Sequence, residues 1–298
     1  MTDVGDLVDT RPPAPGAAVL RYAAFTDGGV GGNPAGVVLQ AGALGDADRL
    51  AVAARIGYSE TAFVEAVDGD GHYRVRYFSP QAEVAFCGHA TIAAAVAIAD
   101  RDGPGLLQFD TRAGPVEVRT RLTAAGVTAT LTSVPTRTRP AGAAEMDAAL
   151  TALRWQRGDL DRRYPVHVAY AGNDHLVLAV RERTRLAALD YDYAALAKLM
   201  AAQGWTTVHL VWAADSTTFH ARDPFPPGGV VEDAATGAAA AAFGGYLRAL
   251  ALVDLPARVT IHQGADMGRP SLLLVDLAAG DDRVQVTGTA APIPEGPT

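Results

Sequence analysis

Two stretches of this chain place a glycine and polar residues immediately before a run of alanines. The first stretch, at residues 86–95, reads FCGHATIAAA, and the second, at residues 232–241, reads EDAATGAAAA. Their glycines, Gly88 and Gly237, lie 149 positions apart, which is half of the 298 residues. Because alanine favours helices, this pattern predicts two similar domains that each direct the N-terminus of a small-residue helix at a shared cleft.

The segments around the two runs read mainly as strands, and helical spacing also predicts helices at 46–56 and 193–203. The expected fold is therefore of the α+β class. Residues 133–144, with two prolines in mid-chain, are the best candidate for a linker. The expected domains are a flexible tail at 1–17, a first lobe at 18–134 and a second lobe at 145–298, whose last strand can return to the first lobe.

Charge and cysteine content exclude several classes of function. The formal net charge of −8 argues against nucleic acid or an anionic membrane as a partner, and no apolar run is long enough to cross a bilayer. Cys87 is the only cysteine, so no intramolecular disulfide can form and a reducing compartment, the cytoplasm, is expected. The seven histidines lack metal-ligand spacing and no nucleotide-binding motif occurs, so neither a metal nor a cofactor is expected.

The two predicted helix starts suit the binding of an anion. A helix N-terminus presents unpaired N–H groups and the positive end of the helix dipole. Two such ends that converge would hold a substrate carboxylate or stabilise an enolate as it develops. Plain helix capping is the alternative, and Asp233 and Thr236 are residue types that suit it. The spacing of half a chain favours the functional interpretation.

Three further residues are candidates for chemistry, each with a structural alternative. Glu60, between a predicted helix and an apolar strand, is either a partly buried general acid–base or a solvated loop residue. His89 either transfers protons or is a hydrogen-bonded core histidine. Cys87 is either a thiolate of lowered pKa or a small buried side chain. The second half has no cysteine, so a racemase mechanism with two opposed thiols is excluded.

Five motifs resemble those of the PhzF family, the phenazine biosynthesis-like proteins with the diaminopimelate-epimerase-like fold. They cover the chain from about residue 20 to 290 in the family's order, and any one of them alone would be weak. The matching motifs are GNPAGV at 32–37, SETAF at 59–63, YFSP through CGHAT at 77–91, EDAATGA at 232–238 and QGADMGRPS at 263–271.

The resemblance implies two pseudo-symmetric lobes, each a β-barrel-like sheet wrapped around a central alanine-rich helix, with the active site between them. It also implies cofactor-free proton transfer and a homodimer. In family members that act on dihydro-hydroxyanthranilate, the glutamate at the position of Glu60 moves a proton between carbons, and His89 and Asp233 would assist it. Backbone amides at the helix starts would hold the carboxylate of the small substrate, at Gly88, Gly237 and Ala238.

Two residues depart from the family's second helix motif. Ala234 stands where the family usually has proline, and Ala238 stands where it often has serine. A hydrogen bond to a charged group contributes about 1.5–3 kcal/mol, so loss of that hydroxyl changes what the site can hold. The resemblance therefore leaves room for a substrate other than the phenazine precursor, in another pathway of secondary metabolism.

The leading hypothesis is a cofactor-independent isomerase that moves a proton, and with it a double bond, on a small unsaturated carboxylic acid. Glu60 would be its single acid–base. The alternative is an epimerase or racemase, which needs two bases on opposite faces of the substrate, and Glu60 and Asp233 are the only evident pair. A third possibility is a non-catalytic protein that binds small acids, although the presence of Glu60, His89 and Asp233 together argues against it.

Overall fold

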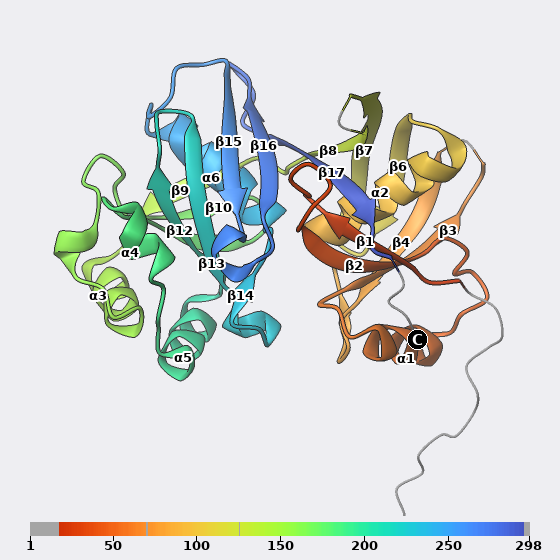
Figure 1. The fold of residues 1–298 in the computed structure, drawn as a ribbon, viewed down its shortest axis with the longest axis horizontal. Helices are drawn as coiled ribbons and strands as arrows, with labels where there is room; N and C mark the ends of the chain where they lie inside the picture. The colour runs from red at the N-terminus through yellow and green to blue at the C-terminus, as the bar shows by residue number, and fades with distance from the viewer. Residues whose placement is uncertain (1–17, 70, 125, 295–298) are drawn as a thin grey trace, which may run out of the picture.

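The computed structural model describes residues 18–69, 71–124 and 126–294, which form two lobes side by side (Figure 1). The tail expected at 1–17 lies outside the described residues. Each lobe wraps a curved sheet around one buried helix, which is α2 (Gly88–Asp102) in the first lobe and α6 (Gly237–Ala249) in the second. The α+β class and the pair of lobes around alanine-rich helices are therefore confirmed.

The first lobe is built from β1 (Leu20–Ala24), β2 (Asn33–Val38), β3 (Thr61–Ala66), β4 (His72–Phe78), β5 (Glu83–Val84), β6 (Leu106–Thr111), β7 (Gly114–Thr123), β8 (Gly126–Thr132) and β17 (Gln285–Pro292). Eight of these strands close into a barrel, in the order β1–β2–β3–β4–β6–β7–β8–β17 and back to β1. The β2–β3 and β4–β6 pairs are parallel, and the other neighbours are antiparallel. Strand β5 pairs with β4 just before α2 begins.

The second lobe repeats this arrangement with β9 (Arg137–Pro140), β10 (His167–Tyr170), β11 (Asp174–Ala179), β12 (Trp205–Ala213), β13 (Thr218–Pro224), β14 (Glu232–Asp233), β15 (Ala257–Gln263) and β16 (Ser271–Leu277). Its sheet runs β9–β10–β11–β12–β13–β15–β16–β17. The parallel pairs β11–β12 and β13–β15 correspond to the two in the first lobe. Strand β14 pairs with β13 just before α6, as β5 pairs with β4 before α2.

The lobes exchange strands where the chain crosses between them. Strand β17 pairs with β16 of the second lobe at its start and with β1 of the first lobe at its end, while β8 runs beside it (Figure 1). In return, β8 leads into β9, which pairs with β10 of the second lobe. The segment expected to be a linker, 133–144, thus contains a strand of the second sheet. Its Ser133 and Thr136 N–H groups also donate to backbone carbonyls of 282–284.

Small residues in the central helices let the sheets approach closely. A Cβ atom at Gly244 of α6 would lie 2.7 Å from Val275 Cγ1, and one at Gly245 would lie 2.3 Å from Thr136 Oγ1. In α2, the eleven consecutive residues 89–99 are all buried. Because even one added carbon would collide with the sheet, the alanine and glycine content of these helices follows from the barrel around them.

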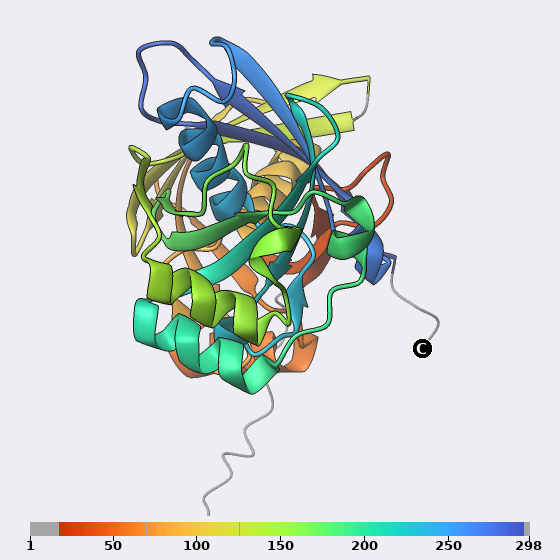
Figure 2. The same ribbon diagram turned by 90° about the vertical axis from the view of Figure 1, so that its left-hand side faces the viewer.

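The remaining helices cover the outer faces of the sheets. Helix α1 (Asp46–Ile56) packs on the first barrel, where Phe63 and Phe78 lie beneath it. Helices α3 (Ala143–Ala152), α4 (Arg183–Ala187) and α5 (Tyr193–Gln203) cover the second sheet around Trp155 and Trp205. Figure 2 shows α3 and α5 beside each other on that outer face. Short 3₁₀ turns lie at Arg157–Asp159, Pro226–Gly228 and Ala265–Met267.

Helices α1 and α5 have the bounds that helical spacing predicts, whereas α3 and α4 were not predicted. Helix α4 has only five residues, too short for a periodic signal, and α3 begins inside the expected linker. In the part of the chain that the structure describes, no helix is both long enough and apolar enough to cross a membrane.

Candidate active site

The residues that begin α2 and α6 meet at the junction of the lobes. The two helices contact each other, and Asn33 of the first lobe donates to the Ala235 carbonyl just before α6. Cys87 is the N-cap of α2 and Thr236 is the N-cap of α6. The second lobe repeats the first, and Thr236 has the N-cap position there that Cys87 has in the first lobe. A threonine hydroxyl therefore corresponds to the cysteine thiol.

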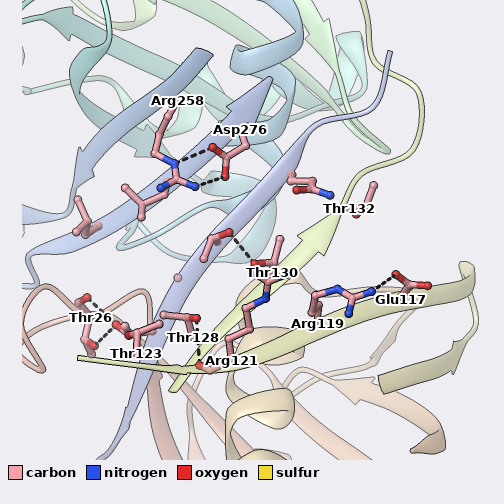
Figure 3. Close-up of a pocket in the computed structure, with 16 residues that line it drawn as sticks. Thr26, Glu117, Arg119, Arg121, Thr123, Thr128, Thr130, Thr132, Arg258 and Asp276 are labelled. Atoms are coloured by element: carbon pink, nitrogen blue, oxygen red, sulfur yellow. Dashed lines mark hydrogen bonds and ion pairs between the residues drawn. The ribbon is translucent and has the colours of Figure 1, made fainter. Parts of the chain in front are cut away.

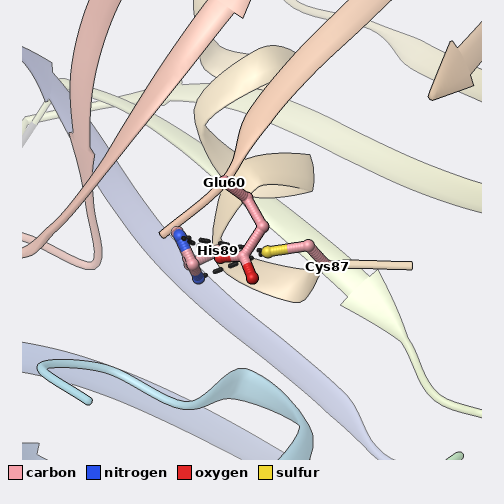
Figure 4. A group of neighbouring side chains, drawn as sticks. All are labelled: Glu60, Cys87 and His89. Atoms are coloured by element: carbon pink, nitrogen blue, oxygen red, sulfur yellow. Dashed lines mark hydrogen bonds and ion pairs between the residues drawn. The ribbon is translucent and has the colours of Figure 1, made fainter. Parts of the chain in front are cut away.

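Glu60 lies immediately before β3, where the chain turns from α1 into the barrel. Gly57 caps the end of helix α1 in the left-handed conformation (φ 72°) that glycine tolerates, and the Glu60 carbonyl accepts from the Gly36 N–H at 3.2 Å. This fixed backbone directs the carboxylate to His89, whose Nε2 lies 3.5 Å from Glu60 Oε2 (Figure 4). The Glu60 side chain is 14% exposed, which is partly buried rather than solvated.

Cys87 completes a cluster of three with Glu60 and His89. Its Sγ atom lies 3.4 Å from His89 Nδ1 and 3.9 Å from His89 Nε2 (Figure 4). Ser59 Oγ also lies 3.4 Å from His89 Nε2. Burial raises the pKa of the Cys87 thiol well above its ordinary value, and the negative charge of Glu60 raises it further. The thiol is therefore neutral near pH 7, as expected for a small buried side chain and not for a nucleophilic thiolate.

Asp233 is the second carboxyl group of the site and comes from the other lobe. One oxygen, Oδ1, accepts from Asn33 Nδ2 at 2.7 Å, and the other, Oδ2, accepts from Thr236 Oγ1 at 2.8 Å. Burial raises the pKa of Asp233 to about 6, and the nearby Glu60 carboxylate adds to this rise. The charge of His89 and the hydrogen bonds from Thr236 and Asn33 act in the opposite direction.

Asn33 and Gln263 are site residues that chemical reasoning from the sequence missed. Gln263 is fully buried; its Nε2 donates to the Asp233 carbonyl at 2.9 Å and its Oε1 accepts from the Thr236 N–H at 3.0 Å. The next residue, Gly264, has a φ of 74°, and a Cβ there would lie 2.6 Å from the Ala234 carbonyl oxygen. Asn33 and Gln263 lie in the motifs GNPAGV and QGADMGRPS given above. These motifs mark where the two residues stand in the sequence, but they do not indicate what the side chains do.

The residues predicted to hold a substrate carboxylate lie in the first turns of the two helices. Gly88 begins α2, and a Cβ atom there would meet no heavy atom within 4 Å. Gly237 begins α6 and is tightly packed, because a Cβ atom there would lie 3.3 Å from Phe25 Cζ. Ala238 follows it and is half-buried. The open space lies on the α2 side, and a role in binding substrate stays a prediction for all three.

A separate polar groove of about 460 Å³ lies on the outer face of the sheet at β7, β8, β17 and β16 (Figure 3). Threonines and arginines line it, and its charges are largely paired: Arg258 binds Asp276 at 2.7 Å, and Arg119 lies 3.8 Å from Glu117. None of the residues that line this groove belongs to the cluster of Glu60, His89 and Asp233. It is therefore not part of the site described above.

One buried carboxyl group, Asp233, one partly buried carboxyl group, Glu60, and the buried His89 lie near one another between the two lobes, and groups of these kinds can exchange protons with a substrate. The environment holds the pKa of Asp233 near 6, within the range where a side chain both gives and takes a proton near neutral pH. Such an arrangement is typical of enzymes that work by general acid–base chemistry.

Comparison with known proteins gives the family. Residues 22–296 match the phenazine biosynthesis-like proteins, PhzC-PhzF. An isomerase of Deinococcus radiodurans is 34% identical over 95% of both chains. A trans-2,3-dihydro-3-hydroxyanthranilate isomerase of Pseudomonas chlororaphis is 28% identical over 92% of this chain and 96% of its own length. The solved structure of a PhzF-family protein of Bacillus anthracis superposes with a TM-score of 0.82 at 23% identity, over 93% of this chain and 96% of that one.

The chain belongs to the phenazine biosynthesis-like protein family, and like its relatives it is an isomerase. The predicted family and fold are thereby confirmed.

Proposed function

We propose that this isomerase moves a proton between two carbons of a small unsaturated carboxylic acid, without a cofactor, and that Glu60 carries the proton. The observation that supports this most is the position of the Glu60 carboxylate, 3.5 Å from His89 Nε2 and partly shielded from solvent. A general base needs such a position, with room to reach a substrate and little competition from bulk water.

In the proposed reaction Glu60 removes a proton from a carbon made acidic by the conjugated acid. The negative charge that develops passes into the substrate's conjugated system and its carboxylate, where N–H groups in the first turns of α2 and α6 stabilise it. Glu60 then returns the proton to the other end of that system. His89 assists by holding the Glu60 carboxylate through its Nε2 atom.

Asp233 is the fixed partner of Glu60 in this reaction: it is held in place and assists without carrying the proton. With a pKa of about 6, it is present in both protonation states close to neutral pH, and its protonated form can donate a hydrogen bond to the substrate. Its two oxygens are held by Asn33 and Thr236, so it is less free to follow a moving proton than Glu60 is.

For the substrate we propose the chemical class of trans-2,3-dihydro-3-hydroxyanthranilate, which is named for the P. chlororaphis relative. Ala238 offers no hydroxyl group in the first turn of α6, so a related acid with one polar group fewer fits this site better. We place the reaction in secondary metabolism and the enzyme in the cytoplasm. We also propose a homodimer, which light scattering tests by giving twice the mass of one chain.

The test is turnover of such acids in D₂O, followed by NMR, with Glu60→Gln and the control Glu65→Gln. Glu65 lies on the same strand, β3, and forms an exposed pair with Arg74. Relocation of the double bond by the wild type and the control, but not by Glu60→Gln, supports the proposal. Inversion at one carbon with deuterium at that carbon identifies an epimerase instead. Binding without exchange of any C–H proton identifies a non-catalytic binding protein.

A further inference from the structure

Proton transfer by Glu60 gives no role to Cys87, although the thiol lies beside both Glu60 and His89. The Cys87 sulfur, a nitrogen of His89 and a carboxylate oxygen of Glu60 all lie within 4.8 Å of one another. Glu60 stands immediately before β3, Cys87 is the N-cap of α2 and His89 is the second residue of that helix (Figure 4). The cluster is therefore set by the fold of the first lobe and not by one flexible loop.

The distances approach those of a zinc site. A tetrahedral Zn²⁺ holds sulfur at about 2.3 Å and nitrogen or oxygen at about 2.0–2.2 Å, which puts neighbouring ligand atoms about 3.3–3.6 Å apart. Here Sγ of Cys87 lies 3.9 Å from Nε2 of His89, and that Nε2 lies 3.5 Å from Oε2 of Glu60. The ligand atoms of Cys87 and Glu60 lie within 4.8 Å of each other, so the three side chains would draw closer together to hold the ion.

The kind and number of donors also suit a thiophilic ion. One thiolate, one imidazole and one carboxylate are ligands that Zn²⁺ and Co²⁺ accept, and three protein ligands leave a coordination position open. A second carboxyl group, Asp233, is close enough for its charge to act on Cys87. A bound cation would offset the negative charge that Glu60 and Asp233 place around Cys87.

We propose that Cys87, His89 and Glu60 form a binding site for Zn²⁺, and that occupation of this site inhibits the enzyme. As the ion binds, a Zn–S bond forms and the proton of the Cys87 thiol leaves to solvent; no atom is oxidised or reduced. The bound ion occupies a lone pair of Glu60 and the Nε2 atom of His89. Coordination lowers the basicity of the Glu60 carboxylate and restrains it, so that Glu60 no longer takes a proton from a substrate.

The test is titration of the purified protein with Co²⁺, a coloured substitute for Zn²⁺. Cys87 is the only cysteine, so a thiolate-to-cobalt charge-transfer band in the near ultraviolet can arise from this residue alone. We expect the band to rise to one Co²⁺ per chain and to disappear when Zn²⁺ is added. Cys87→Ser abolishes the band, and Glu60→Gln weakens Co²⁺ binding by about tenfold or more.

His72→Gln is the matched control, because His72 lies with Asp68 and Asp110 in an exposed cluster that offers similar donors without sulfur. This variant keeps the band unchanged. Absence of the band in the folded wild type, or a band that Glu60→Gln leaves at full affinity, overturns the proposal. The assay uses no substrate, so its result stands whatever the reaction of the enzyme proves to be. Circular dichroism shows whether each variant is folded, and the wild-type titration decides the question even if one is not.

Discussion

The starts of α2 and α6 occupy equivalent places in the two lobes but are built differently. At α2, the N-cap thiol of Cys87 lies beside Glu60 and His89, and His89 is 3.4 Å from the thiol sulfur and 3.5 Å from the Glu60 carboxylate. At α6, the N-cap hydroxyl of Thr236 donates to Asp233 at 2.8 Å and accepts from Gln263 Nε2 at 3.0 Å. The first start carries loosely held groups, and the second carries a carboxyl in a closed hydrogen-bond network.

This difference shows how a duplicated fold can divide one task between its halves. A base that moves a proton must change its contacts during the reaction, which suits Glu60 with its long contact to His89. A carboxyl that only donates or accepts a hydrogen bond works best when it is preorganised, which suits Asp233. The two helix starts are thus similar in backbone and different in chemistry.

The largest effect is expected from Glu60→Gln, which removes the proposed carrier of the proton. Because general acid–base catalysis contributes about 10²–10⁴-fold, we expect kcat to fall by that factor while the melting temperature stays close to that of the wild type. Steady-state kinetics beside Glu65→Gln measures this. Turnover of Glu60→Gln near the wild-type rate would contradict the proposal that Glu60 carries the proton.

Asp233→Asn should have a smaller effect on kcat, about 10²-fold, and should remove a limb of the pH–rate profile near pH 6. The amide keeps the shape of the side chain but cannot titrate. Profiles of kcat/KM against pH, which report the groups of the free enzyme, test this for the two proteins; a limb near pH 6 that persists in Asp233→Asn assigns it to another group.

The same substitution has a consequence for stability against pH. The folded state raises the pKa of Asp233 from 3.8 to about 6, so between these values the folded protein binds more protons than the unfolded chain. The free energy of unfolding therefore falls as pH rises from about 4 to 6, by about 3 kcal/mol from this group. Denaturant titrations across this range should show the fall in the wild type and its loss in Asp233→Asn. An equal fall in both proteins would contradict the assignment.

Asn33→Ala removes the donor that joins the first lobe to Asp233. A hydrogen bond to a charged group contributes about 1.5–3 kcal/mol, so the free energy of unfolding should drop by an amount of that order at pH 7. The pKa of Asp233 should also rise, since Asn33 favours its ionised form. A limb of the pH–rate profile that stays in place, or moves to lower pH, would show that Asn33 does not act through Asp233.

The smallest expected effect is a difference in stability that comes only from how tightly the two helix starts are packed. Gly88→Ala adds a methyl group in open space, so it should leave stability unchanged or raise it by about 0.5–1 kcal/mol. Gly237→Ala places the same methyl group 3.3 Å from Phe25 Cζ and should lower stability. Thermal melts of the two variants give the sign of each change, and equal changes would contradict the difference in packing.

The sequence predicted much of the fold, because the two small-residue helices and the helices at 46–56 and 193–203 carry their own local patterns. It did not predict β9 (Arg137–Pro140), whose four residues have no apolar alternation and whose strand conformation comes from pairing with β10. Sequence reasoning selected Glu60, His89 and Asp233, but not the bond from Asn33 to Asp233, which joins residues 200 positions apart. Such a contact exists only because the lobes meet there.

The most direct test of this division of labour is the rate at which substrate C–H protons exchange with D₂O, measured by NMR for Glu60→Gln and Asp233→Asn side by side. If Glu60 carries the proton and Asp233 is its fixed partner, exchange stops in Glu60→Gln and continues at a reduced rate in Asp233→Asn. Exchange that continues in Glu60→Gln, or that stops only in Asp233→Asn, would contradict the account.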